Sequence, residues 1–151
     1  MLNNEDSVEV INHLIEISND GEDGFLDASE EVENLQLKQY LLRKSEQVKQ
    51  SVIELQNLVR ELGGEPSDSS TIGGYLHRMW IDIKTFITEN DTLAVLEELE
   101  RGEDVALHEY REASKKDLPI NATHVVARQL LGAQRNHDEI REMRNTAEAN
   151  K

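Results

Sequence analysis

The 151-residue sequence has no cysteine, two prolines, eight glycines and 4% aromatic residues. The absence of cysteine excludes disulfides, thiolate metal sites and cysteine nucleophiles. So few turn-forming and aromatic residues argue against β-sandwiches and barrels, which need many turns and many β-branched or aromatic strand residues. No apolar run reaches the roughly 18 residues that a transmembrane helix needs. We therefore expect no membrane span and no secretory signal.

Basic residues are also scarce, with 16 Lys and Arg against 31 Asp and Glu and a net charge of −15. From Met1 to Leu37 there are eleven acidic residues and no basic one. Such a surface repels a phosphate backbone, so we expect no nucleic-acid partner. The uneven charge is interpreted as complementary, solvated helix faces rather than as a cation-attracting surface.

Apolar residues recur at spacings of three and four along the whole chain, which predicts an all-α fold. We expect one domain over residues 1–151, with helices at about 6–33, 36–62, 72–88, 91–116 and 121–147. The pattern predicts two helical hairpins joined by a long crossover that contains an extra short helix. That connectivity is typical of a ferritin-like four-helix bundle. Trp80, in the short helix, is expected to lie across the outside of the bundle and cover apolar surface.

The two halves of the sequence resemble each other. Gly21-Glu22-Asp23 recurs as Gly102-Glu103-Asp104, 81 residues later, at the same place in the apolar repeat. In the helices that follow, an offset of 88 places Glu46-x-x-Lys49 on Gln134-x-x-His137. The repeat supports two related hairpins.

Six polar residues fall on or beside helix faces that are otherwise apolar. The register of the two hairpins predicts that all six lie at one level near the middle of the bundle. A buried carboxylate is costly unless a partner neutralises it, so these residues are candidates for a site. The predicted polar core site consists of Glu22, Glu46, Lys49, Glu103, Gln134 and His137.

Two interpretations of this site stay open. Di-iron and di-manganese bundles use one Glu from each of two helices and Glu-x-x-His from each of the other two. Here Lys49 replaces a histidine and Gln134 replaces a glutamate. In the metal interpretation, one Fe or Mn ion is held by ligands drawn from Glu103, His137, Gln134, Glu46 and Glu22. In the other, there is no metal: Lys49 neutralises Glu22 and Glu46, and His137 hydrogen-bonds Glu103 in a layer that fixes the helix register.

At these residues the chain resembles a bacterial family of small ferritin-like four-helix-bundle proteins, built on a domain of unknown function. The resemblance covers about residues 8–145. It rests on the runs LIEISNDGEDGF, GGYLHRMWIDIK and LEELERGEDVALHEY and on the stretch from Gln134 to Asp138. The resemblance implies the ferritin-like bundle and a bacterial cytoplasmic setting, and it carries no established activity.

No GxSxG, phosphate-binding loop or HExxH motif occurs, which leaves hydrolases and nucleotide enzymes without support. We predict a non-enzymatic bundle protein, stress-related by analogy with the ferritin-like class or an interaction protein. Its partner is expected to be a second copy of the chain or another protein. The alternative is a metal-dependent oxidase or iron-handling protein that uses the same core site.

Overall fold

The computed structural model describes residues 1–69 and 75–151, apart from six side chains within the helices (Asp20, Glu22, Asp23, Tyr75, Leu76 and His77). The described residues form helices and connections, with no strand among them. The helices are α1 (Asn4–Glu31), α2 (Leu35–Glu61), α3 (Tyr75–Thr88), α4 (Thr92–Ser114) and α5 (Ile120–Ala149). The prediction of an all-α chain with five helices is confirmed. Residues 72–74, where the third predicted helix begins, lie outside the described residues.

Three helices begin at an Asn or Asp that caps the first turn. The side chains of Asn3, Asn34 and Asp91 each accept a hydrogen bond from the backbone N–H three residues further on, at 2.8, 2.9 and 3.1 Å. Such caps satisfy N–H groups that have no partner within the helix. Asn34 thereby fixes the turn between α1 and α2, where the sequence has no proline or glycine.

The end of α2 depends on Gly63. Its φ of 83° lies in the left-handed region, which a residue without Cβ adopts at little cost. Its backbone N–H donates to the carbonyl of Arg60 at 3.0 Å, and that of Gly64 donates to Val59 at 2.9 Å. The last carbonyl groups of α2 are therefore satisfied as the chain turns away.

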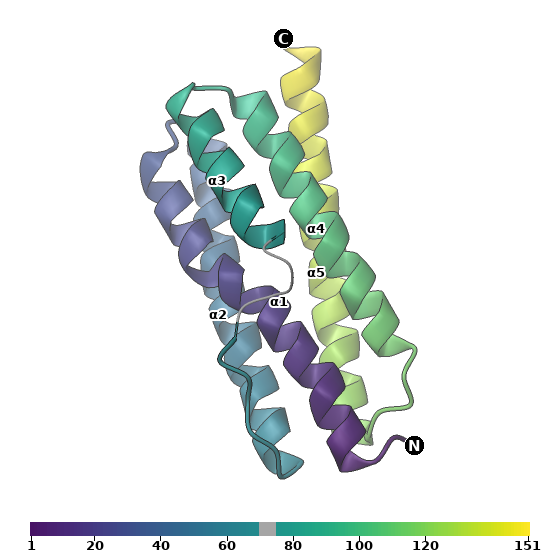
Figure 1. Cartoon of the computed structure of the whole chain (residues 1–151). Coiled ribbons are helices and arrows are strands. Elements are labelled where there is room, and N and C mark those ends of the chain that lie inside the picture. Colours follow the sequence, from purple (N-terminus) through teal and green to yellow (C-terminus); the bar gives the residue numbers. More distant parts are fainter. Residues whose placement is uncertain (70–74) are drawn as a thin grey trace.

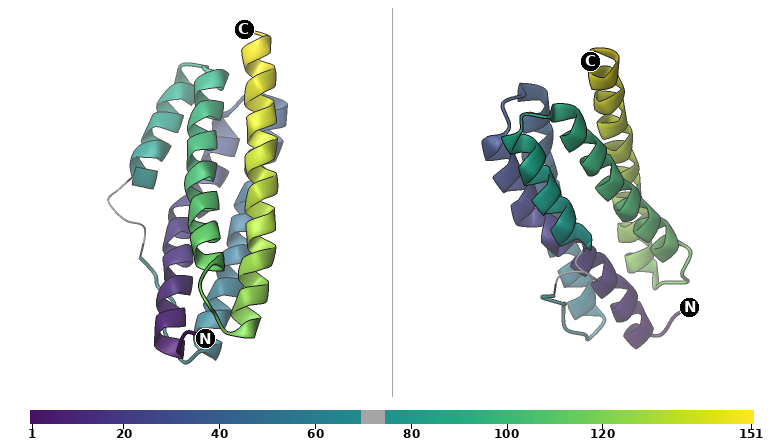
Figure 2. Two further views of the ribbon diagram at one scale, coloured as in Figure 1. Left: turned by 90° about the vertical axis from the view of Figure 1, so that its right-hand side faces the viewer. Right: turned by 45° about the horizontal axis from the view of Figure 1, so that its top comes forward.

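The four long helices form two antiparallel hairpins (Figure 1). In that view α1 rises and α2 descends beside it, whereas α4 descends and α5 rises. The shorter α3 contacts both α1 and α4. Contacts are far more extensive within each hairpin than between α1 and α4 or between α2 and α5. Figure 2 shows α4 and α5 running side by side.

The core consists of two apolar clusters. One lies towards the α1–α2 and α3–α4 turns and includes residues from all five helices, and the other lies towards the opposite end of the four long helices. Trp80 belongs to the first cluster and packs edge-on to Phe25, with ring centroids 4.9 Å apart. Gly24 lies directly beneath the indole, because a Cβ there would come within 2.5 Å of the ring. Through these contacts Trp80 packs α3 against α1. The helix α3 itself lies against the outside of the hairpins.

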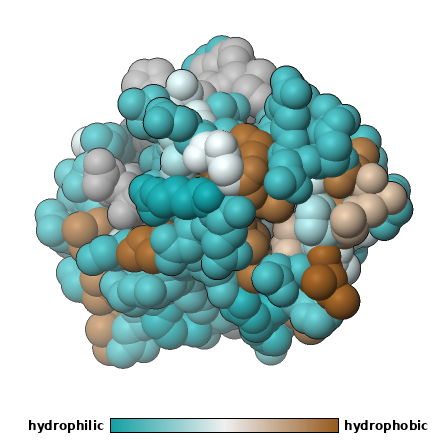
Figure 3. All heavy atoms as spheres, turned by 90° about the horizontal axis from the view of Figure 1, so that it is seen from below, coloured by the Kyte–Doolittle hydropathy of each residue, from teal (hydrophilic) through white to brown (hydrophobic). Residues whose placement is uncertain are grey.

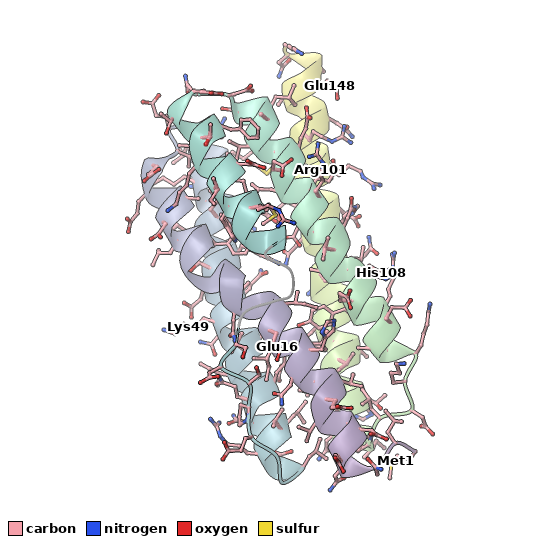
Figure 4. All side chains as sticks on the ribbon, viewed as in Figure 1. Met1, Glu16, Lys49, Arg101, His108 and Glu148 are labelled. Atoms are coloured by element: carbon pink, nitrogen blue, oxygen red, sulfur yellow. The ribbon has the colours of Figure 1, made fainter. Side chains whose placement is uncertain are left out.

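The start of the connection after α2 is hydrogen-bonded to α1. The Ser67 hydroxyl donates to Glu16 at 2.7 Å, and the Ser67 backbone N–H donates to Asn12 at 2.8 Å. The Asn12 amide in turn donates to the carbonyl of Glu65 at 3.0 Å. Glu16 is labelled beside this segment in Figure 4. The chain therefore leaves the first hairpin along a defined path.

The end of the molecule nearest the N-terminus is mostly hydrophilic, with separated hydrophobic residues (Figure 3). Among the helices within the described residues, none is long and apolar enough to cross a membrane.

Candidate functional site

A cavity of about 1050 Å³ lies between α2 and α5 and extends inwards to α1, α3 and α4. Small residues face it from three helices: Gly21 on α1, Gly102 and Ala106 on α4, and Gly132 and Ala133 on α5. Positions on the inner faces that carry little side-chain volume leave this space unfilled. The remaining wall combines aliphatic and aromatic side chains from all five helices with polar and charged side chains that come mostly from α2 and α5.

A buried carboxylate lies on the wall of this cavity. Glu103 on α4 is 3% exposed, and its Oε1 accepts a hydrogen bond from the Tyr40 hydroxyl at 3.0 Å. The Lys44 Nζ lies 3.2 Å from Oε1 and 3.3 Å from Oε2 of the same carboxylate. Tyr40 and Lys44 are four residues apart on α2, so both point from one helix face to one acceptor. The ion pair compensates for burying the carboxylate.

Tyr40 stays a neutral donor in this cluster. Burial raises the pKa of Tyr40 well above its ordinary value, and the negative charge of Glu103 raises it further. A phenolate beside a carboxylate in a buried position would bring two like charges together. The hydroxyl proton therefore remains on Tyr40 and in the hydrogen bond to Glu103.

Lys44 is held on its other side by an aromatic ring. Its Nζ lies 5.8 Å from the centroid of Phe25, which packs against Trp80. A ring face attracts a cation, and Lys44 is only 12% exposed. Lys44 and Glu103 both line the cavity, whereas Tyr40 supports Glu103 from behind.

Polar side chains join α2 and α5 across the outer side of the cavity. Arg128 forms an ion pair with Glu54, and the Gln129 amide donates to the same carboxylate at 2.8 Å. The hydrogen bond from Arg128 is the main reason that the pKa of Glu54 lies below its ordinary value. Further along, the Asn136 amide donates to Gln47 at 3.0 Å. Hydrogen bonds and ion pairs thus contribute to this junction alongside the apolar contacts.

Two of the predicted site residues, Glu103 and His137, are buried as expected, but they have different partners. The Nε2 of His137 contacts Asp104 rather than Glu103, and its Nδ1 lies 3.6 Å from Asp138. Successive residues on a helix point about 100° apart, so Glu103 faces α2 and the next residue faces α5. The hydrogen bond expected between His137 and Glu103 is absent.

Glu46 and Lys49 do not enter the core. Both side chains are exposed, and Glu46 accepts a hydrogen bond from Gln50 at 3.1 Å. Lys49 lies on the outer side of α2 in Figure 4. The inward positions of α2 include Leu41, Lys44 and Val52. The buried cation on α2 is therefore Lys44, which pairs with Glu103, and not Lys49, as the sequence predicts.

Gln134 is half-buried in a surface network rather than in the centre of the bundle. It accepts a hydrogen bond from Arg111 at 2.8 Å and donates to Asp138 at 2.9 Å. The side chain of Glu22 lies outside the described residues. Of the six predicted site residues, the structure buries Glu103 and His137, and Glu46 and Glu103 both line the cavity. No hydrogen bond or ion pair joins any two of the five described ones.

Sequence reasoning missed Tyr40 and Lys44. The available signal was their spacing of four, together with the position of Lys44 between Leu41 and Val48 on the apolar stripe. A long amphipathic side chain at the edge of such a stripe can place its charge inside or outside the bundle. Only the distance to Glu103 shows which side it takes here.

The described residues do not fit a metal ion. They contain no cluster of three or more His, Asp or Glu side chains placed to bind one. Glu103 already contacts the Lys44 ammonium, and His137 is turned to Asp104. Because Glu22 belongs to the predicted ligands and lies outside the description, the metal interpretation stays a prediction.

A comparison with protein families matches residues 6–116 to a domain of unknown function, DUF2383. The match runs from the first turn of α1 to just beyond the end of α4 and leaves out α5. No curated protein matches the chain.

Proposed function

The chain belongs to the family of the domain of unknown function DUF2383, and from its cavity we propose that it is a non-enzymatic binding protein for a small, mostly apolar molecule. The observation that carries this proposal is the cavity of about 1050 Å³ between the two hairpins. Small-molecule sites are typically concave, mostly apolar and a few hundred to about 1000 Å³ in volume, with a few polar groups that orient the ligand.

The chemistry of the cavity wall supports a ligand with an uncharged body. Ile17, Leu99 and Ala106 contribute apolar surface, and Phe25 contributes an aromatic ring. The Lys44–Glu103 pair supplies polar groups of opposite charge whose sum is zero. A polar but uncharged group on the ligand satisfies this place better than a full charge does.

The fold that we propose for this binding protein is a ferritin-like bundle, with α3 in the crossover between the hairpins. The two antiparallel hairpins and the long connection between them support it. By its resemblance to the small bacterial bundle proteins we assign the protein to a bacterial cytoplasm. Its net charge of −15 supports the absence of a nucleic-acid partner.

The binding proposal is tested by titrating the protein with N-phenyl-1-naphthylamine, an uncharged apolar dye whose fluorescence rises in apolar surroundings. We expect saturable binding. Ala106→Phe places a large side chain on the cavity wall and should weaken binding by about tenfold or more, equivalent to about 1.4 kcal/mol. Ala127→Phe makes the same change at an exposed position of α5 and should bind as the parent does.

Circular dichroism of both variants checks that the helices are intact. Failure of the unmodified chain to bind the dye would overturn the proposal. Equal dye affinity in folded Ala106→Phe and Ala127→Phe would do so as well, because the dye would then bind elsewhere.

A further inference from the structure

Among the lysines of the chain, Lys44 alone lies on the described wall of the cavity. Its side chain is 12% exposed, whereas Lys49, five residues along the same helix, is exposed to solvent. A primary amine is the protein group that condenses with aldehydes and ketones. A molecule bound at this part of the cavity therefore lies next to one particular amine.

Lys44 has a proton acceptor beside it and a group that orients this acceptor. The carboxylate of Glu103 lies 3.2 and 3.3 Å from the Nζ, within reach to accept a proton from it. The Tyr40 hydroxyl, 3.0 Å from the same carboxylate, holds Glu103 in position. Nucleophile, proton acceptor and orienting group are thus connected in sequence.

From this geometry we propose that Lys44 captures a small, mostly apolar aldehyde or ketone as a reversible imine. This inference rests on the proposed function, because the carbonyl compound must first enter the cavity. It names both the chemical class of the ligand and the atom that holds it.

The capture is balanced in atoms and charge. The Lys44 ammonium passes one proton to Glu103, and the free amine attacks the carbonyl carbon. The carbonyl oxygen takes up two protons, one from Glu103 and one from the nitrogen, and leaves as water while the C=N bond forms. The third hydrogen of the original ammonium stays on the nitrogen, so one ammonium and one carbonyl compound give one protonated imine, one water and no net oxidation or reduction.

The site that holds the resting ammonium also suits the product. The protonated imine keeps its positive charge at the same nitrogen, between the Glu103 carboxylate and the Phe25 ring, which lies 5.8 Å from Nζ. Neither contact has to be broken for the product to be stabilised. An exposed lysine has no such surroundings.

The experiment traps the imine by reduction. The full chain is incubated with limiting 2-naphthaldehyde and sodium cyanoborohydride, digested, and analysed by mass spectrometry for the site of the naphthylmethyl label. We expect Lys44 to be labelled roughly 100-fold faster than Lys49, the lower end of what a positioned proton acceptor contributes. Lys44→Arg keeps a cation for Glu103 and should lose this label, whereas Lys49→Arg should keep it.

Labelling of Lys44 at the same rate as Lys49 would overturn the imine proposal. A parallel titration with 2-ethylnaphthalene, which has a similar shape and no carbonyl group, separates this failure from failure of the proposed function. Binding of the hydrocarbon without preferential labelling of Lys44 would leave a binding protein and refute the imine. Absence of both binding and labelling would refute both proposals.

Discussion

The stability of the centre of the molecule depends on one lysine. Lys44 is the neutralising cation next to the buried carboxylate of Glu103, at 3.2 Å. Breaking a buried ion pair from one side leaves an uncompensated charge, which is far more costly than loss of a surface pair.

We therefore predict that Lys44→Met lowers the free energy of unfolding by about 3 kcal/mol. Lys49→Met, on the solvent side of the same helix, should change it by less than about 0.5 kcal/mol. Urea unfolding followed by circular dichroism measures both. The sequence alone assigns the neutralising role to Lys49. Equal stability of the two variants would show that Lys44 is not the cation that compensates the buried charge of Glu103.

The raised pKa of Tyr40 predicts a loss of stability in alkali. An unfolded tyrosine titrates near pH 10, whereas Tyr40 keeps its proton in the native state because of burial and the charge of Glu103. Below about pH 10 both states are protonated and the contribution of Tyr40 is constant; above it only the unfolded state loses the proton, so stability falls as pH rises.

Tyr40→Phe should make this alkaline fall in the free energy of unfolding less steep. Denaturant unfolding at a series of pH values from about 8 to about 11 measures the slope. Tyr110, whose pKa is also raised by burial, contributes to the slope that remains. An unchanged slope in Tyr40→Phe would contradict a native-state proton on Tyr40.

At the residue scale, the sequence identifies Glu103 because a carboxylate on an apolar stripe stands out. It does not identify Lys44, whose long side chain can lie on either side of a helix edge. His137 is recognised as a buried residue, but its partner depends on whether Glu103 or Asp104 faces α5. Turning α4 about its axis by one residue would exchange the two. The pattern of apolar residues spaced three and four apart does not distinguish these two orientations.

At the scale of the elements, the packing of α3 on α1 depends on a glycine, Gly24, which has no side chain. A Cβ at Gly24 would come within 2.5 Å of the Trp80 ring, whereas a Cβ at Gly132 on α5 would have its nearest described neighbour at 3.9 Å. Both glycines lie inside long helices, where alanine is intrinsically favoured by about 1 kcal/mol.

We predict opposite effects for the same substitution at these two places. Gly24→Ala should lower the thermal unfolding midpoint because the indole must move away from α1. Gly132→Ala should raise the free energy of unfolding by about 0.5–1 kcal/mol. Thermal and urea unfolding measure these changes, and stabilisation by Gly24→Ala would show that Trp80 does not pack on this backbone.

The helices themselves follow closely from the sequence. Spacings of three and four define their faces, and Asn34, Gly63 and Pro119 mark places where they begin or end. The cavity could not be predicted in the same way. A row of small inward residues permits either close helix contact or an opening, and the distance between hairpins decides between them.

At the scale of the whole molecule, charge repulsion opposes compaction. A net charge of −15 is distributed over 151 residues, and the first 37 contain no basic residue. Salt shortens the range of this repulsion from about 30 Å at 0.01 M to about 8 Å at 0.15 M.

We therefore predict that the thermal unfolding midpoint rises as sodium chloride increases from about 0.01 M to about 0.15 M. Differential scanning calorimetry in a buffer of constant pH measures it. A falling midpoint would mean that exposed ion pairs, such as Arg128 with Glu54, contribute more than the overall repulsion costs.

Because most helix contacts lie within each hairpin, the chain can be divided between the hairpins with little loss of contacts. A break in the connection between α2 and α3 would leave two fragments, each with a complete hairpin and most of its native neighbours. Their reassembly would become a bimolecular reaction, whereas in the intact chain the connection supplies a high effective concentration. The cavity, which has walls from both hairpins, would then form only upon fragment complementation.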